Sequence, residues 1–335
     1  MRGLAAIAVM LYHYTTRYDE LYAHPAGLPF RVGEGSVILV FIISGFAITL
    51  SLLKRPYFAA FLVARAGRLL PAYWVAVLLT HAVVSTCGLP GREVGLEATV
   101  ANLTMLQHFI GVADVDGAYW TLAVQMVFYA LTSLLLITGQ FRNRERFCAV
   151  WLTVLFAGAG MAKLGHPLPS ALKTALMLDF GNLFIAGIMF CSVRIGAGTR
   201  AGTAIIVGCL MFDYLFHDTT AFRLSLVFFG TLWLLSTRRL EWLAAKPLDF
   251  LGSISYTLYL LHQDIGYVVM REAYRRGVAS PVEAMALAVA VSMGLATLVS
   301  AVVERPAMRG ARKAWALMEA PLWVPPFALQ PFFRR

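Results

Sequence analysis

Charged residues are scarce in this chain. They make up 14% of its 335 residues, whereas an average soluble domain carries about 25%. A water-soluble protein cannot cover its surface with so few charges, so the composition excludes a soluble enzyme and a disordered protein. Hydrophobic residues make up 59% of the chain, and the mean hydropathy is +0.72. We therefore expect a polytopic helical membrane protein.

Cysteine is also rare, and its spacing fits no metal site. The four cysteines are Cys87, Cys148, Cys191 and Cys209, and no two of them form a CxxC pair. Three lie in apolar runs, where a thiol usually acts as a small packing residue. The sequence therefore predicts neither a disulfide framework nor a zinc site, and no metal is expected.

Acidic residues are fewer than basic ones, which gives a net charge of +10. Such a charge could indicate a nucleic-acid partner. Here, however, the cations lie in short loops between apolar runs, which is typical of the cytoplasmic loops of a membrane protein. We therefore expect the lipid bilayer as a partner and no nucleic acid.

Apolar runs of about membrane length recur from end to end, and we expect an all-α transmembrane bundle of about ten spans. The runs cover residues 2–16, 35–53, 69–86, 118–138, 147–163, 174–193, 201–216, 221–236, 248–270 and 281–303. A half-apolar stretch at 98–111 is expected to lie at the interface or to re-enter the membrane.

The first run offers only about 15 residues, fewer than the ~20 needed to cross a bilayer, so we expect the natural chain to begin upstream. No internal repeat or linker divides the chain. We expect one transmembrane domain over 1–317 and a tail rich in proline and aromatic residues over 318–335, which cannot form a continuous helix.

The loop charges predict the orientation. Segment 54–68 holds four cations and no acid, whereas 87–117 holds one arginine and four acids. Because cations mark the cytoplasmic side, we expect both termini in the cytoplasm, in a bacterial inner or plasma membrane. Segment 271–280, with three arginines on the predicted outer side, does not follow this trend.

Ionisable residues inside spans cost about 2.5–3.5 kcal/mol each on insertion scales, so each is a candidate functional residue. Arg2 and His13 are eleven residues apart and share one helix face, with His13 about 16 Å along the axis and near mid-membrane. A histidine that only hydrogen-bonds a neighbouring helix is an equally good interpretation of this segment alone.

Arg65 and Arg68 are three residues apart and are therefore neighbours on a helix surface. We place them where the third span leaves the cytoplasm. A pair of guanidinium groups at such a mouth suits a phosphate-bearing ligand. On spacing alone, ordinary positive-inside anchoring is the better explanation.

Two further spans carry polar residues. Gln125 lies roughly two turns inside its span and needs a partner there. Steps of four and three residues put Ser255, Tyr259 and His262 on one face of the run 248–270, with His262 near mid-depth. Two mid-depth histidines on different spans, above a cytoplasmic arginine pair, are hard to explain by helix packing.

Taken in order, these stretches resemble the acyltransferase 3 family of membrane acyltransferases. The matching stretches are RGLAAIAVMLYHY, GEGSVILVFIISGFAITL, FLVARAGRLLPAYW, YWTLAVQMVFY, SISYTLYLLH and the triplet Glu304-Arg305-Pro306. The resemblance covers most of the chain and is weakest over 139–245. One departure concerns catalysis, because the family usually has a glutamate where this chain has Gln125.

The resemblance implies an O-acetyltransferase with acyl-CoA, and acetyl-CoA in particular, as donor substrate, and no bound cofactor. The expected acceptor is a sugar hydroxyl of a surface glycan or glycolipid precursor. Arg65 and Arg68 would then hold the donor's phosphates. His13 would act as general base or accept the acyl group itself, two roles that the sequence does not separate.

The remaining candidate residues have supporting roles in this hypothesis. His262 and Tyr259 would orient the acceptor or the base, and Arg2 would balance charge at the thioester oxygen. Two alternatives stay open. Intramembrane charges also mark transporters and flippases, and Gln125 is compatible with a catalytically degenerate homologue that acts as a scaffold.

Overall fold

The computed structural model describes residues 2–22, 30, 35–54, 57–240, 246–277 and 280–319, and within these ranges it contains helices and no strand. The helices are α1 (Arg2–Tyr12), α2 (Tyr18–Tyr22), α3 (Ser36–Lys54), α4 (Phe58–Cys87), α5 (Leu96–Asn102), α6 (Trp120–Ile137), α7 (Arg144–Lys163), α8 (Ser170–Leu176), α9 (Gly181–Arg194), α10 (Arg200–Phe216), α11 (Thr219–Ser236), α12 (Lys246–Leu261), α13 (Gln263–Arg275), α14 (Pro281–Val299) and α15 (Arg305–Glu319). A wide π-turn (His13–Arg17) joins α1 to α2, and a second one (Ser300–Glu304) joins α14 to α15.

The all-α membrane bundle expected from composition is confirmed. Within the described ranges, seven helical stretches are long and apolar enough to cross a membrane, and each overlaps one of the ten predicted runs. The other three runs form shorter helices. The run 201–216 becomes the 17-residue α10, 2–16 is divided by the first π-turn, and 248–270 is broken in two.

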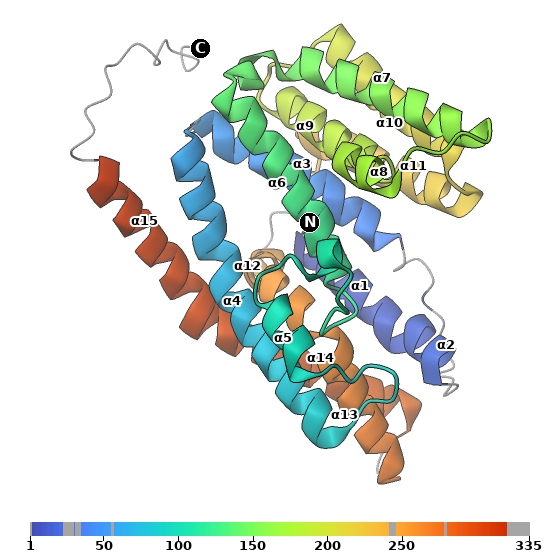
Figure 1. The fold of residues 1–335 in the computed structure, drawn as a ribbon, viewed down its shortest axis with the longest axis vertical. Helices are drawn as coiled ribbons and strands as arrows, with labels where there is room; N and C mark the ends of the chain where they lie inside the picture. The colour runs from blue at the N-terminus through green and yellow to red at the C-terminus, as the bar shows by residue number, and fades with distance from the viewer. Residues whose placement is uncertain are drawn as a thin grey trace.

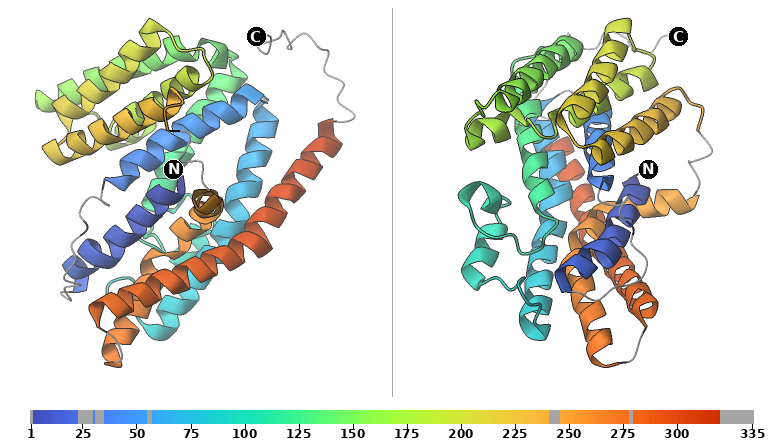
Figure 2. Two further views of the ribbon diagram at one scale, coloured as in Figure 1. Left: turned by 180° about the vertical axis from the view of Figure 1, so that it is seen from behind. Right: turned by 90° about the vertical axis from the view of Figure 1, so that its right-hand side faces the viewer.

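The helices form two groups that differ in their buried cores (Figure 1). One core joins α3 and the second half of α6 to α7, α9, α10 and α11. The other group contains α1, α4 and α12 to α15, with two smaller buried clusters. Here α14 and α15 follow each other as one long rod beside α4 (Figure 2). The candidate site lies where α1, α3, α4, α6 and α12 meet.

Glycines allow the closest helix contact, between α3 and α9. A Cβ on Gly187 would overlap the backbone at Ile42 and Phe46, and a Cβ on Gly45 would overlap the backbone at Phe184. Membrane helices pack through such small residues because lipid offers no hydrophobic drive for association.

The structure corrects the prediction of one helix over 248–270. The chain bends at His262, between α12 and α13. The Tyr14 hydroxyl donates to the carbonyl of His262, and the backbone N–H of Asp264 donates to Oδ2 of Asp116 at 3.0 Å. These side chains take up hydrogen-bonding capacity at the junction and start α13 as a separate helix.

Other boundaries also differ. α4 begins at Phe58 rather than near residue 69, so Arg65 and Arg68 lie inside the helix and not in a loop before it. Only parts of 98–111 are helical, in α5 and in a short turn Gln107–Ile110. The last helix, α15, ends at Glu319, and the rest of the predicted tail lies outside the described residues.

Candidate active site

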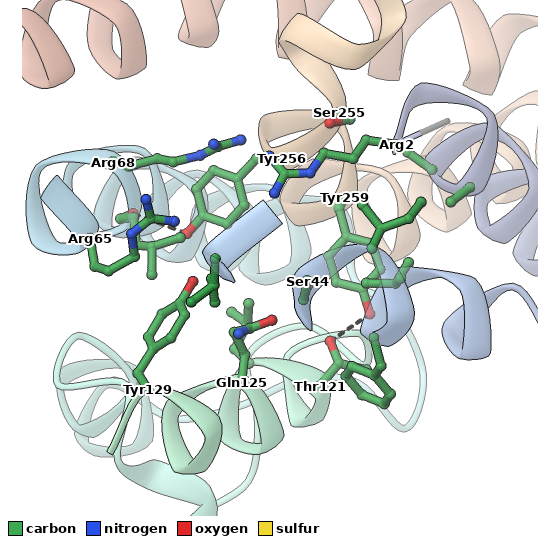
Figure 3. A pocket seen from close by; sticks show the side chains of 18 residues that line it. Arg2, Ser44, Arg65, Arg68, Thr121, Gln125, Tyr129, Ser255, Tyr256 and Tyr259 are labelled. Carbon is green, nitrogen blue, oxygen red and sulfur yellow. Dashed lines mark hydrogen bonds between the residues drawn. The ribbon is translucent and has the colours of Figure 1, made fainter. Parts of the chain in front are cut away.

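A cavity of about 130 Å³ gathers the predicted cationic residues (Figure 3). Arg2 from α1 and the pair Arg65 and Arg68 from α4 line it together. Gln125 of α6 and Tyr259 of α12 also line it. The polar part of the lining is completed by Ser44, Thr121, Tyr129, Ser255 and Tyr256.

Helical spacing explains why these side chains converge. Arg65 and Arg68 are three residues apart on α4, and residues three or four apart project from the same face. The pairs Gln125–Tyr129 on α6 and Ser255–Tyr259 on α12 have the i, i+4 spacing of such a face. In Figure 3 the Gln125 amide and the Tyr129 hydroxyl point towards the arginines.

The narrow cavity is lined by three cations and, within the described ranges, by no acidic residue. Among the residues that the structure describes, no carboxylate forms an ion pair with Arg2, Arg65 or Arg68. Arg65 is held only weakly, with Nη2 3.4 Å from the Ser51 hydroxyl. Nε2 of Gln125 is buried without a partner in this part of the chain. Three cations with spare donors suit an anionic ligand, because charge-assisted bonds to phosphate are strong.

A wider cavity of about 920 Å³ shares the three arginines and continues from them. Its wall adds Lys54, at the end of α3, and Arg194, at the end of α9. The sequence analysis did not select these two residues. The sequence could have identified both as candidate donor-binding residues, since both are cations in the predicted cytoplasmic loops, as Arg65 is.

The two predicted histidines meet. His13 Nδ1 lies 2.7 Å from His262 Nε2, and their rings are stacked with centroids 4.9 Å apart. His262 Nδ1 lies 2.8 Å from the carbonyl oxygen of Tyr259. Because a carbonyl only accepts, Nδ1 of His262 carries the proton and its Nε2 accepts. His13 Nδ1 must then donate, which leaves Nε2 of His13 unprotonated and basic.

The backbone around His13 is unusual. The residue begins the first π-turn, and such wide turns are frequent at functional sites. The hydroxyl of the next residue, Tyr14, donates to the carbonyl of His262 and therefore accepts from the Ser292 hydroxyl at 2.7 Å. His13 itself is only half-buried. The segment thus fixes the histidine pair but leaves His13 reachable.

The arginines and the histidines occupy different compartments. Neither histidine lines either cavity. Tyr259 stands between them, because it lines the arginine cavity and its ring centroid is 5.6 Å from that of His262. Its hydroxyl donates to the carbonyl of Ala118 at 3.1 Å and lies 2.7 Å from the Thr121 hydroxyl. Gln125 accordingly faces the arginines and not His13.

The polar residues of the sixth and seventh predicted spans, Asp179, Asn182 and Asp213, lie apart from this site. Asn182 donates to Asp213 at 2.7 Å, which also pairs with His217 at 2.8 Å. Asp179 pairs with Lys173. They stabilise the other helix group.

Comparison with known proteins identifies the family of the chain. The model of a family described as "Acyltransferase domain" matches residues 1–305. A relative, the exopolysaccharide production protein ExoZ of Rhizobium meliloti (strain 1021), is 26% identical over 307 residues, which is 87% of this chain and 94% of the relative. No solved structure matches the chain. Since the family model covers nearly all of the described bundle, the chain belongs to the acyltransferase 3 family of membrane acyltransferases.

Proposed function

We propose that the protein transfers an acyl group, and an acetyl group in particular, from acyl-CoA to a hydroxyl of a cell-surface carbohydrate or glycolipid precursor. The observation that carries the proposal is the histidine pair, with one basic ring nitrogen left over, next to a cationic cavity. Family membership supports the acyl-transfer chemistry. The relative that is a polysaccharide production protein supports the class of acceptor.

The cationic cavity is the proposed donor site. Its wide part has the volume to take a nucleotide, and the cations around it would bind the phosphates of CoA. Arg65 and Arg68, at the junction of the wide and narrow parts, would hold the donor so that the thioester enters the narrow part. Arg2 lines both parts with this pair and would add a further charge-assisted contact to the donor, away from the reacting carbonyl near His13.

His13 is the proposed general base. Its Nε2 removes the proton of the acceptor hydroxyl, and the oxygen attacks the thioester carbonyl carbon. The carbon–sulfur bond then breaks, and the thiolate of CoA takes the proton back from His13. His262 orients His13 and receives a charge-assisted hydrogen bond when His13 becomes an imidazolium. In the alternative order, Nε2 of His13 first attacks the thioester and takes the acyl group. The acceptor hydroxyl then attacks this acyl-histidine and receives the acyl group.

The proposal is tested with the purified protein in lipid nanodiscs. We expect it to release CoA thiol from acetyl-CoA when de-O-acetylated polysaccharide of the host cell is added, and to form an alkali-labile ester on that polysaccharide. A stoichiometric burst of thiol before acceptor is added would indicate an acyl-histidine. Absence of both thiol and ester, with movement of a labelled glycolipid across vesicles, would instead identify a transporter.

A further inference from the structure

We propose that a cluster of buried polar side chains beside the histidine pair is the acceptor site, and that it binds a polyhydroxylated acceptor of the sugar type. The cluster consists of Tyr18, Gln263, Asp264 and Tyr267. This inference rests on the proposed function, because it assumes that His13 acts on a hydroxyl group.

All four side chains carry a buried polar atom that has no hydrogen-bond partner in the described part of the chain. These atoms are Oε1 of Gln263, Oδ1 of Asp264 and the hydroxyl oxygens of Tyr18 and Tyr267. The four residues are at most 3% exposed. Buried polar groups are almost always paired, because an unpaired one costs about 1–3 kcal/mol. Four such atoms on neighbouring side chains leave hydrogen-bonding capacity that a ligand rich in hydroxyl groups would take up in place of water.

The cluster reaches the candidate base through Tyr267. The Tyr267 ring stands edge-on to His13 with centroids 6.4 Å apart, and the Tyr18 ring packs 5.3 Å from that of Tyr267. Gln263 and Asp264 directly follow His262 at the start of α13. A hydroxyl group of a ligand held by these side chains would be within reach of His13.

The cluster also lies on the far side of the histidines from the donor cavity. The order of residues along α1 and the π-turn shows this. Arg2, at the start of α1, lines the cavity, and Val9 packs against Tyr259. Further along, His13 contacts His262, and Tyr18 follows after the end of the π-turn. Donor and acceptor would thus approach His13 from opposite directions, as transfer across a membrane requires.

The segment before α6 holds the cluster in place. Asp116 accepts from the N–H of Ala118 at 2.9 Å and from that of Asp264 at 3.0 Å. Burial raises the pKa of Asp116 to about 6, against the opposing effect of these two bonds and of Arg92. A Cβ at Gly117 would overlap the Gln263 amide and the Arg92 guanidinium. The ends of the Gln263 and Arg92 side chains therefore meet at Gly117.

The free atoms match the chemistry of a sugar. A carboxylate oxygen and an amide oxygen accept from hydroxyl groups, and a tyrosine hydroxyl both donates and accepts. A sugar offers several hydroxyls at a spacing that such a set can bind, whereas an acyl chain offers none. A site built to bind hydroxyls also rejects analogues that lack them, since its polar groups would then stay unpaired.

The test measures binding and transfer with one probe, an oligosaccharide prepared from the de-O-acetylated polysaccharide of the host cell. Tyr267→Phe removes only a free hydroxyl, and Asp264→Asn keeps the shape of the side chain. We expect each variant to weaken calorimetric binding of the probe in the absence of donor. The expected loss is about three- to ten-fold for Tyr267→Phe and larger for Asp264→Asn. The KM for acetyl-CoA should not change.

Tyr73→Phe is the matched control, because the Tyr73 hydroxyl is also buried without a partner in the described chain but lies in another cluster. It should bind the probe as the wild type does. Equal binding by all variants would overturn the acceptor site and leave the four atoms as binders of water only. Probe binding that depends on Tyr267 without any acetyl transfer would instead refute the proposed function and keep the sugar site.

Discussion

His13 has one ring nitrogen committed to His262 and one free. A positioned general base contributes about 10²–10⁴-fold, so His13→Ala should nearly abolish acyl transfer while the protein stays folded and binds acetyl-CoA. His217→Ala, which removes a half-buried histidine of the other helix group, should keep transfer. The measurement is the rate of thiol release from acetyl-CoA by each of the two variants in nanodiscs. Transfer at the wild-type rate by a well-expressed His13→Ala protein would remove the role of His13.

Arg65 and Arg68 should contribute to donor affinity. Loss of one charge-assisted phosphate contact costs about 1.5–3 kcal/mol, which corresponds to roughly a ten- to hundred-fold higher KM for acetyl-CoA. Arg65→Ala and Arg68→Ala are compared with Arg142→Ala, an exposed arginine outside both cavities. If all three variants keep the wild-type KM, the pair only anchors the helix at the membrane surface.

Gln125 lines the cavity together with the three arginines, so a carboxylate there gains cationic neighbours. We expect Gln125→Glu to keep or raise the melting temperature and, without contact to His13, to leave the pH optimum unchanged. Gln107→Glu is the contrast, because the buried Gln107 donates to Asp114 at 2.7 Å and a second acid would repel it. A lower melting temperature for Gln125→Glu, or a higher pH optimum, would contradict this arrangement.

At the scale of elements, the contact of α3 with α9 is sensitive to added volume. Gly187→Ala would push a methyl group into the backbone of α3, and overpacking typically costs about 1–3 kcal/mol. Gly230→Ala is the control, since nothing lies within 4 Å of its added Cβ on α11. Thermal unfolding in detergent should separate the two, and an equal melting temperature would mean that the helices shift without cost.

The sequence predicted most helices because long apolar runs have few alternative structures in a membrane. The prediction of helix boundaries failed where side-chain hydrogen bonds interrupt a long apolar run. The break at His262 depends on Asp116 and Tyr14, which are distant in sequence, and no periodicity within 248–270 reveals it. The arginines that line the cavity could be selected from the sequence. The separation of this cavity from the histidines depends on the position of Tyr259, which the sequence does not give.

At the scale of the whole molecule, orientation stays a prediction from loop charge. Of the four cysteines only Cys87 is exposed, at the end of α4, and this end leads into the acidic segment 87–117. We expect an impermeant maleimide to label Cys87 in intact cells. Arg142→Cys in a Cys87→Ser background should stay unlabelled until the cells are opened. Labelling of position 142 in intact cells would reverse the orientation.

A small buried layer, formed by Val9, Ala118 and Tyr259, lies between the arginine cavity and the histidine pair. This layer bears on the voltage across the membrane. An energised membrane holds a voltage, and moving one elementary charge through it involves about 2.3 kcal/mol per 100 mV. With this layer closed, the phosphates of the proposed donor remain among the arginines. In the proposed transfer the acyl group leaves CoA and one proton returns to its thiolate, so no net charge passes Tyr259. Modification of a glycan on the far side would then proceed without discharging the membrane.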